Sequence, residues 1–225
     1  GHLVLFQQLF SIENSSIAFE VFVHFATLIV ILFYLKKEIV FFSKKIFDKD
    51  FLIPFVLGFL PAGIAGVFIL AFLKDIFSSV SVVACGFFVT AIFLELSHRT
   101  KYQVPETENI GLEWQMPKPK EALIIGLAQA LAIIPGISRS GATVCTGLLL
   151  GLSKEAALKF SFLISVPVIL GATIVHIPEL LSFDSAELIS CFLGFLTSLI
   201  FGFFALKMLV VFVKEQKLRI FAGYV

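Results

Sequence analysis

One arginine stands among serines and glycines in the stretch IIPGISRSGATV, residues 133–144. The planar guanidinium of Arg139 can bind two phosphate oxygens at once. Three hydroxyl groups beside it, those of Ser138, Ser140 and Thr143, can orient the same oxygens. If a helix starts here, its free N–H groups would also attract an anion. The stretch therefore favours a site for a phosphate or pyrophosphate group.

Other residues near this stretch could join the site. Gly136 and Gly141 let the backbone approach a ligand closely, and Gln129 could reach the tip as a hydrogen-bond donor. Two alternatives stay open. Small residues in membrane helices often serve only close helix packing, and Arg139 could pair with Glu20 as a structural ion pair.

The elements that must position these residues are membrane helices. Of 225 residues, 59% are hydrophobic and 15% are charged, and the mean hydropathy is +1.03, which is outside the range of soluble domains. The net charge of +1 gives no reason to expect a nucleic-acid partner. Apolar runs long enough to span a bilayer cover residues 17–35, 51–73, 78–96, 160–177 and 187–213, and residues 218–225 look like a sixth span cut short. The chain is expected to be all-α and polytopic, with about six transmembrane helices in a single integral membrane domain, 1–225.

Residues 121–152 have a different pattern. Two short apolar runs flank PGISRSG, and neither is long enough to cross the membrane alone. The pair is predicted to form a re-entrant helix hairpin. Its irregular tip, with Arg139, is tolerable at bilayer depth only if it is buried in protein or lines a wet cavity.

The loop charges favour this layout. If the hairpin enters and leaves on one side, fourteen Lys and Arg residues fall on one face and only Lys74 falls on the other. This bias places the basic face in the cytoplasm. The basic loops are residues 36–50, 97–120, 153–159 and 214–219.

The chain also contains an internal similarity. LGFLPAGIAGVFILAFLK (57–74) resembles LGFLTSLIFGFFALKMLV (193–210), and FEVFVHF (19–25) takes the place of FSFLISV (160–166). The charge assignment gives the two halves opposite orientations, which predicts an inverted-topology repeat with its site near the midplane. The predicted divisions are a first repeat at 1–100, a cytoplasmic loop at 101–120 and a second repeat at 121–225.

The register of this repeat points to His2. His2 precedes Phe19 by 17 residues, and Thr143 precedes Phe160 by the same number. His2 is therefore predicted to lie opposite Arg139, at the tip of a first hairpin whose leading limb is absent. On this interpretation the chain is truncated at both ends.

The segment PGISRSGAT resembles the second motif, P-G-x-S-R-S-x-x-T, of the bacterial undecaprenyl-pyrophosphate phosphatases of the bacitracin-resistance family. Pro135, Gly136, Ser138, Arg139, Ser140 and Thr143 fill its fixed positions. The resemblance extends to FEVFVHFATL and FSFLISVPVILGAT, and so covers essentially the whole chain. Of the family's other motif, E-x-x-x-E followed by S-S-T-G-H, only the closing Gly1 and His2 are present.

The resemblance implies a polytopic hydrolase of the bacterial cytoplasmic membrane, with its active site toward the extracytoplasmic side. It implies hydrolysis of undecaprenyl pyrophosphate to the monophosphate carrier and inorganic phosphate, which serves cell-wall synthesis and resistance to bacitracin. A divalent cation, Mg²⁺ or Ca²⁺, is expected, with carboxylate ligands upstream of Gly1.

We expect Arg139 to clamp the phosphoryl group, Ser138 and Thr143 to orient its oxygens, and His2 to act as general acid or base or to hold a nucleophile. Gly136, Ser140, Gly141 and Gln129 are expected to bind substrate. A homodimer stays open. The alternative function is a transporter or flippase of a prenyl phosphate lipid, because many secondary transporters share inverted repeats with broken helices.

Overall fold

The computed structural model describes residues 2, 5, 9, 17–45, 47–72, 79–99, 116–215 and 217–224. All the regular elements in these ranges are α-helices. Five of them are long and apolar enough to cross a membrane. They are α2 (Ile17–Tyr34), α4 (Lys49–Phe72), α5 (Val80–Arg99), α8 (Lys154–Leu180) and α9 (Ser185–Lys214). The predicted all-α, polytopic membrane fold is confirmed.

Four shorter helices of the described ranges lie outside this set, and two of them follow spanning helices. The helix α3 (Lys36–Ser43) follows α2 after one residue. The helix α10 (Leu218–Tyr224) begins where the sixth span was expected, and its seven residues are too few to cross a bilayer. In the described part of the chain, the count of spanning helices is therefore five, not six.

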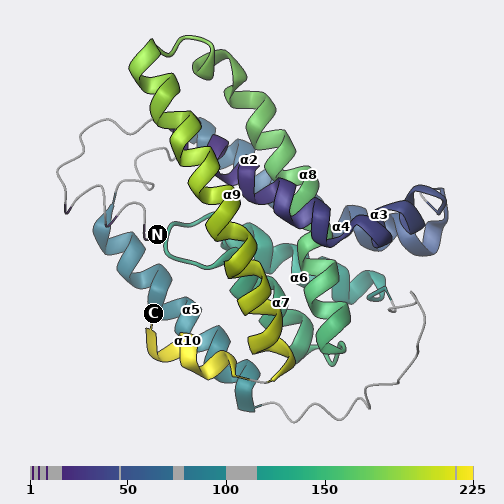
Figure 1. The fold of residues 1–225 in the computed structure, drawn as a ribbon. Coiled ribbons are helices and arrows are strands. Elements are labelled where there is room, and N and C mark those ends of the chain that lie inside the picture. The colour runs from purple at the N-terminus through teal and green to yellow at the C-terminus, as the bar shows by residue number, and fades with distance from the viewer. Residues whose placement is uncertain are drawn as a thin grey trace.

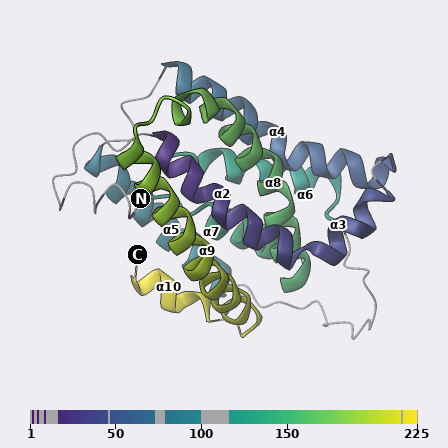
Figure 2. The same ribbon diagram turned by 45° about the horizontal axis from the view of Figure 1, so that its top comes forward.

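The segment predicted to turn back in the membrane forms two short helices. They are α6 (Pro119–Leu131), of 13 residues, and α7 (Arg139–Leu149), of 11 residues. A loop joins them, and the two helices pack against each other. Figures 1 and 2 both show α6 and α7 among the longer helices, and Pro135 and Gly136 of their loop are buried. As predicted, residues 121–152 do not cross as one straight helix.

Local sequence explains where α7 and the helices after it begin and end. The Ser138 side chain caps α7 by accepting a hydrogen bond from the N–H of Gly141 at 3.1 Å. Gly151 follows the end of α7 and has a φ of 87°, a conformation that glycine adopts at little cost. Ser153 caps α8, and Asp184 caps α9.

A pair of close contacts matches the internal similarity of the sequence. A Cβ added to Gly58 in α4 would lie 2.6 Å from Ile164 and 2.8 Å from Phe160, both in α8. A Cβ added to Gly194 in α9 would lie 3.1 Å from Phe19 and 3.2 Å from Val23, both in α2. The sequence comparison pairs these same positions. The repeat boundaries stay a prediction, and these matching contacts favour it.

The basic segments predicted to face the cytoplasm contact one another. Lys159 at the start of α8 forms an ion pair with Glu38 of α3 at 2.7 Å. Lys154 donates to the carbonyl oxygen of Lys214, at the end of α9, at 2.8 Å. Arg219 of α10 lies 3.4 Å from Glu95, near the end of α5. The helix ends that carry the basic loops therefore meet at one end of the molecule.

Candidate active site

The loop between α6 and α7 is held against α5. Gly136 has a φ of 94°, which favours glycine. A Cβ added to Gly86 of α5 would lie 2.4 Å from the carbonyl oxygen of Pro135. The buried hydroxyl of Thr90 donates to the carbonyl oxygen of Gly136 at 3.0 Å and accepts from the N–H of Ser138 at 2.9 Å. The position of the loop is therefore set by α5.

The first turn of α7 directs its polar groups toward one space. Backbone N–H groups at the start of a helix lack partners within the helix and carry the positive end of its dipole. One of them, from Gly141, is used by the cap at Ser138. Among the described residues, no hydrogen bond occupies the N–H groups of Arg139 and Ser140. This turn can thus receive an anion.

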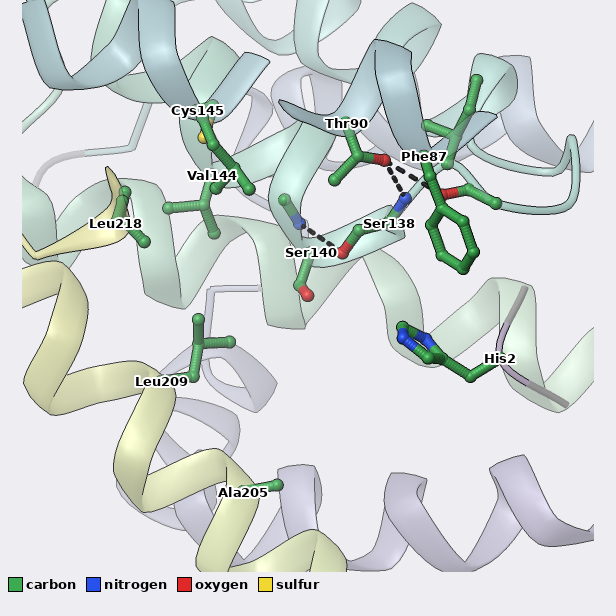
Figure 3. Close-up of a pocket in the computed structure, with 14 residues that line it drawn as sticks. His2, Phe87, Thr90, Ser138, Ser140, Val144, Cys145, Ala205, Leu209 and Leu218 are labelled. Atoms are coloured by element: carbon green, nitrogen blue, oxygen red, sulfur yellow. Dashed lines mark hydrogen bonds between the residues drawn. The ribbon is translucent and has the colours of Figure 1, made fainter. Parts of the chain in front are cut away.

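A cavity of about 370 Å³ opens beside this turn. Its polar side chains come from His2, Thr90, Ser138 and Ser140, and most of its remaining wall is apolar. Figure 3 shows His2 beside Phe87, with Leu218, Val144 and Cys145 at the opposite end. The lining residues are His2, Phe87, Thr90, Leu94, Gly136, Ile137, Ser138, Ser140, Gly141, Val144, Cys145, Ala205, Leu209 and Leu218. A space of this kind suits a ligand with one polar and one apolar part.

Arg139 and Thr143 face α8, on another side of α7. The Nη1 group of Arg139 donates to the carbonyl oxygen of Ser161 at 3.3 Å. The Thr143 hydroxyl shares a hydrogen bond of 2.5 Å with the Ser161 hydroxyl and also lies 2.8 Å from the carbonyl oxygen of Arg139. Among the described residues, Arg139 has no ion pair, so the alternative partner Glu20 does not hold it.

The structure thus gathers part of the predicted site. It brings His2, Gly136, Ser138, Ser140 and Gly141 around one cavity. Arg139 follows directly in the chain but contacts Ser161, and Thr143 is fully buried against the same residue. His2 lies near the tip of the second hairpin, where the register of the repeat predicts it.

Known proteins resemble the whole chain. The family model for the bacitracin resistance protein BacA matches residues 1–225. The chain belongs to this family. A relative from Halothermothrix orenii, called undecaprenyl-diphosphatase, is 39% identical over 229 residues, covering 100% of this chain and 85% of the relative. A protein of the same name from Elusimicrobium minutum is 36% identical, covering 100% of this chain and 85% of the relative. Another, from Methanothermobacter thermautotrophicus, is 40% identical, covering 75% of this chain and 91% of the relative.

In this bacitracin-resistance family chain, Gln129 does not line the cavity. Its side chain is only 2% exposed, and its amide nitrogen donates to the carbonyl oxygens of Gly58 and Ile164. The expectation that Gln129 reaches the tip as a substrate ligand is therefore not met in this arrangement. The reason is that α6 turns this position toward α4 and α8 and away from α5.

The residues around the cavity do not by themselves fit a divalent cation. Mg²⁺ and Ca²⁺ prefer carboxylate and other oxygen ligands. Within the described ranges, no three His, Cys, Asp or Glu side chains gather to hold a metal ion. The described lining offers His2 and hydroxyl groups but no carboxylate. A cation at this cavity would therefore need ligands beyond the described residues.

Sequence reasoning missed Thr90 and Ser161. Each is one of several hydroxyl residues in an apolar span, and both are buried. Such residues commonly bond to their own helix backbone, so their type alone gave no signal. The only available hint was position, because Ser161 lies 18 residues after Thr143 in the segment FSFLISV that carries the resemblance.

Proposed function

We propose that this chain hydrolyses undecaprenyl pyrophosphate to undecaprenyl phosphate and inorganic phosphate, which recycles the lipid carrier for cell-wall synthesis. The names of its relatives support this reaction. The observation that carries the proposal is the cavity at the start of α7, which combines polar groups with a mainly apolar wall. A prenyl pyrophosphate has the same division between a charged head and an apolar tail.

In this proposal Arg139 binds the phosphoryl group that is transferred. A guanidinium has five N–H donors, and the structure uses one of them, in the bond to Ser161. The other N–H groups can meet phosphate oxygens and offset the negative charge that develops on them. The bond to Ser161 restricts how the guanidinium is turned.

The remaining residues have distinct roles in this proposal. Ser138 and Ser140 lie at the cavity and orient the oxygens of the headgroup. His2 acts on a proton at the same place, as general acid or base, or holds the nucleophile. Thr143 is bonded to Ser161. Its role is therefore to hold the turn that carries Arg139 in place, and it does not contact the phosphate.

A requirement for Mg²⁺ or Ca²⁺ remains part of the proposal. When bound, such a cation would offset charge on the pyrophosphate. The assay for it is phosphate release by the full-length protein after treatment with a chelator, followed by return of each metal. Unchanged release in the chelator would contradict this requirement.

The proposed location is the bacterial cytoplasmic membrane, with the cavity accessible from the extracytoplasmic side. Support comes from the charges, because the basic segments meet at one end of the molecule through Lys159, Lys154 and Arg219. Labelling of single cysteines at either end of α8 in intact cells, with a reagent that does not cross membranes, tests the orientation. Labelling at the end near Lys154 alone would contradict it.

A homodimer is also part of the proposal. Large apolar side chains on α9 face outward, where either lipid or a second copy could cover them. Cross-linking of the full-length protein in native membranes separates the two cases. The exposed residues of α9 include Leu193, Leu196, Ile200, Phe201 and Phe204.

Reconstitution in liposomes tests the reaction itself. We expect the full-length protein to release phosphate from undecaprenyl pyrophosphate without moving the lipid between leaflets. Translocation without release would favour the alternative, a transporter or flippase of a prenyl phosphate lipid. If the protein neither releases phosphate nor translocates the lipid, only a structural role would remain, and the proposed function would be overturned.

A further inference from the structure

Gln129 lies where three helices meet. Its side chain is 2% exposed. Its Nε2 group donates to the carbonyl oxygen of Gly58 in α4 at 3.3 Å and to that of Ile164 in α8 at 3.4 Å. A side-chain amide has two hydrogens, so these bonds use its whole donor capacity. Gln129 therefore links α6 to two spanning helices at once.

Both acceptors belong to turns that contain a proline. Gly58 lies three residues before Pro61 in α4, and Ile164 lies three residues before Pro167 in α8. Because proline has no N–H, each helix lacks the bond to the carbonyl group four residues earlier, next to the acceptor of Gln129. Neighbouring helices commonly support the backbone at such places in membranes. At both prolines Gln129 bonds to the carbonyl group next to the one that proline leaves free, so it ties each weakened turn to α6.

The three helices are in close contact at this junction. A Cβ added to Gly126, three residues before Gln129, would lie 2.4 Å from the carbonyl oxygen of Leu57. A Cβ added to Gly58 would lie 2.6 Å from a methyl group of Ile164. These glycines bring the backbones near enough for one amide to reach both carbonyl groups. The geometry leaves little room for the α8 turn to shift while the amide is in place.

The amide also carries a cost. Its Oε1 atom is buried and has no hydrogen-bond partner, which lowers stability. An apolar side chain of the same length, such as methionine, would avoid this cost. A role in stability alone therefore does not account for a glutamine here.

The same turn of α8 holds the arginine. Ser161 lies three residues before Ile164, one helical turn away. Its carbonyl oxygen accepts the bond from Arg139 at 3.3 Å, and its hydroxyl group contacts Thr143. The turn is thus bonded to α6 through Gln129 and to α7 through Arg139 and Thr143.

We propose that Gln129 is a positioning residue for Arg139: by fixing the proline-containing turn of α8, it fixes the Ser161 carbonyl group that orients the guanidinium. The inference rests on the proposed function, because it takes Arg139 to be the group that meets the pyrophosphate. Gln129 itself does not touch the substrate. Displacement of a catalytic group by about 1 Å can lower a rate about 100-fold.

A double-mutant cycle in the full-length protein tests this. The variant Gln129→Met keeps the length of the side chain but removes both donors. We expect kcat/KM for phosphate release to fall between about 10- and 100-fold in the wild-type background. In the Arg139→Lys background, the same change should lower kcat/KM less than about 3-fold, because residues that act through one another are not additive. Equal losses in both backgrounds would overturn the proposal.

Thr146→Val is the matched control. Thr146 is also buried, and its hydroxyl group has no hydrogen-bond partner, so removal of the hydroxyl breaks no bond. We expect kcat/KM within about 2-fold of wild type. The thermal midpoint of Thr146→Val should stay at or above that of wild type, because the change removes an unpartnered buried oxygen. That of Gln129→Met should stay close to wild type, because the loss of two long hydrogen bonds is offset by removal of the unpartnered Oε1 atom. A loss of activity in Gln129→Met that matched a loss of folded protein would argue for a structural role only and against the proposal.

A second variant covers the case in which Gln129→Met does not fold. Gln129→Asn keeps the amide but is one methylene shorter, so it cannot reach Gly58 and Ile164 together. Wild-type kcat/KM in this variant would overturn the proposal, and a loss that disappears in the Arg139→Lys background would support it. Failure of the proposed function has a different signature, because wild-type protein would then release no phosphate.

Discussion

Two faces of the short helix α7 have different surroundings. One face lines the cavity with Ser140, Gly141 and Val144. Another face packs on α8, where Thr143 is fully buried and bonded to Ser161. Helical periodicity explains this division, because positions four apart share a face. Arg139 and Thr143 both bond to Ser161 of α8, whereas Ser140 and Val144 both line the cavity.

This division teaches that the motif residues need not all contact the ligand. The cavity face presents a small hydroxyl group and backbone, which leave space. The face on α8 presents groups whose hydrogen bonds are made within the protein. Arg139 is bonded through one N–H on the face that packs on α8. Its side chain is long and has further donors, so these can still bind a ligand in the cavity. The comparison can be tested by changing each face in turn.

The largest effect is expected for Arg139→Lys. A lysine keeps the charge but cannot bind two oxygens in one plane, and it loses the geometry of the bond to Ser161. We expect kcat/KM for phosphate release to fall between about 100- and 1,000-fold, as when a donor to a developing oxyanion is removed. The measurement is steady-state phosphate release from undecaprenyl pyrophosphate in detergent.

Arg139→Met provides the comparison for charge. If the planar pair of donors on the guanidinium is required, kcat/KM for phosphate release should be only slightly higher in Arg139→Lys than in Arg139→Met. Turnover near that of wild type in Arg139→Lys would contradict the assigned role of the guanidinium. The residues of α7 that face α8 would then contribute to folding and not to binding of the phosphoryl group.

Gly86→Ala should have the next largest effect, because it displaces both faces together. The added Cβ would lie 2.4 Å from the carbonyl oxygen of Pro135 and 2.8 Å from the backbone of Gly136. Backbone cannot yield as a flexible side chain can, so the loop must move. We expect a loss of about 100-fold in kcat/KM and a cost of about 1–3 kcal/mol in stability.

Gly63→Ala is the control for this change, because a Cβ at Gly63 of α4 would have no atom within 4 Å. Both variants introduce alanine into a spanning helix. The thermal midpoint and phosphate release of each variant should be measured together. Equal behaviour of the two variants would show that α5 does not set the position of the loop.

A smaller effect is expected for Thr143→Val, on the face that packs on α8. The change keeps the shape of the side chain but leaves the Ser161 hydroxyl without its partner. The loss of a buried hydrogen bond of this type is worth about 1–1.5 kcal/mol, so we expect kcat/KM to fall about 10-fold if that energy holds the Arg139 turn in place. Thr146→Val, one turn further on, should change little because the Thr146 hydroxyl has no partner. Similar activity in the two variants would remove the distinction between them.

The sequence predicted the elements of this fold better than the contacts between them. Apolar runs and their lengths located five spans, and the break at PGISRSG located the loop between α6 and α7. The partners of Arg139 and Gln129 depended on which helices pack side by side and on the rotation of each helix about its axis. A single sequence does not contain that information, because a side chain of one type fits many neighbours in an apolar bundle.

The candidate site shows the same limit. The residue types in 133–144 indicated a phosphate site, and the repeat indicated that His2 lies near it. The bonds of Thr90 to the loop and of Ser161 to Arg139 were not predicted. Thr90 and Ser161 lie in spans far from the loop in the sequence. Taken alone, each of them resembles an ordinary hydroxyl residue on a membrane helix.

The smallest effect is expected for Ser140→Ala, on the cavity face of α7. Ser140 lines the cavity, and its backbone N–H is at the first turn of the helix, where it can meet an anion whatever the side chain is. Alanine keeps that N–H and removes only a hydroxyl group that water can replace. We therefore expect kcat/KM to fall about 3-fold, with most of the change in KM. Steady-state kinetics over a range of substrate concentrations separates KM from kcat. A loss as large as that of Thr143→Val, carried by kcat, would show that the cavity face does more than bind the headgroup, and Ser140 would become a candidate for orienting the nucleophile.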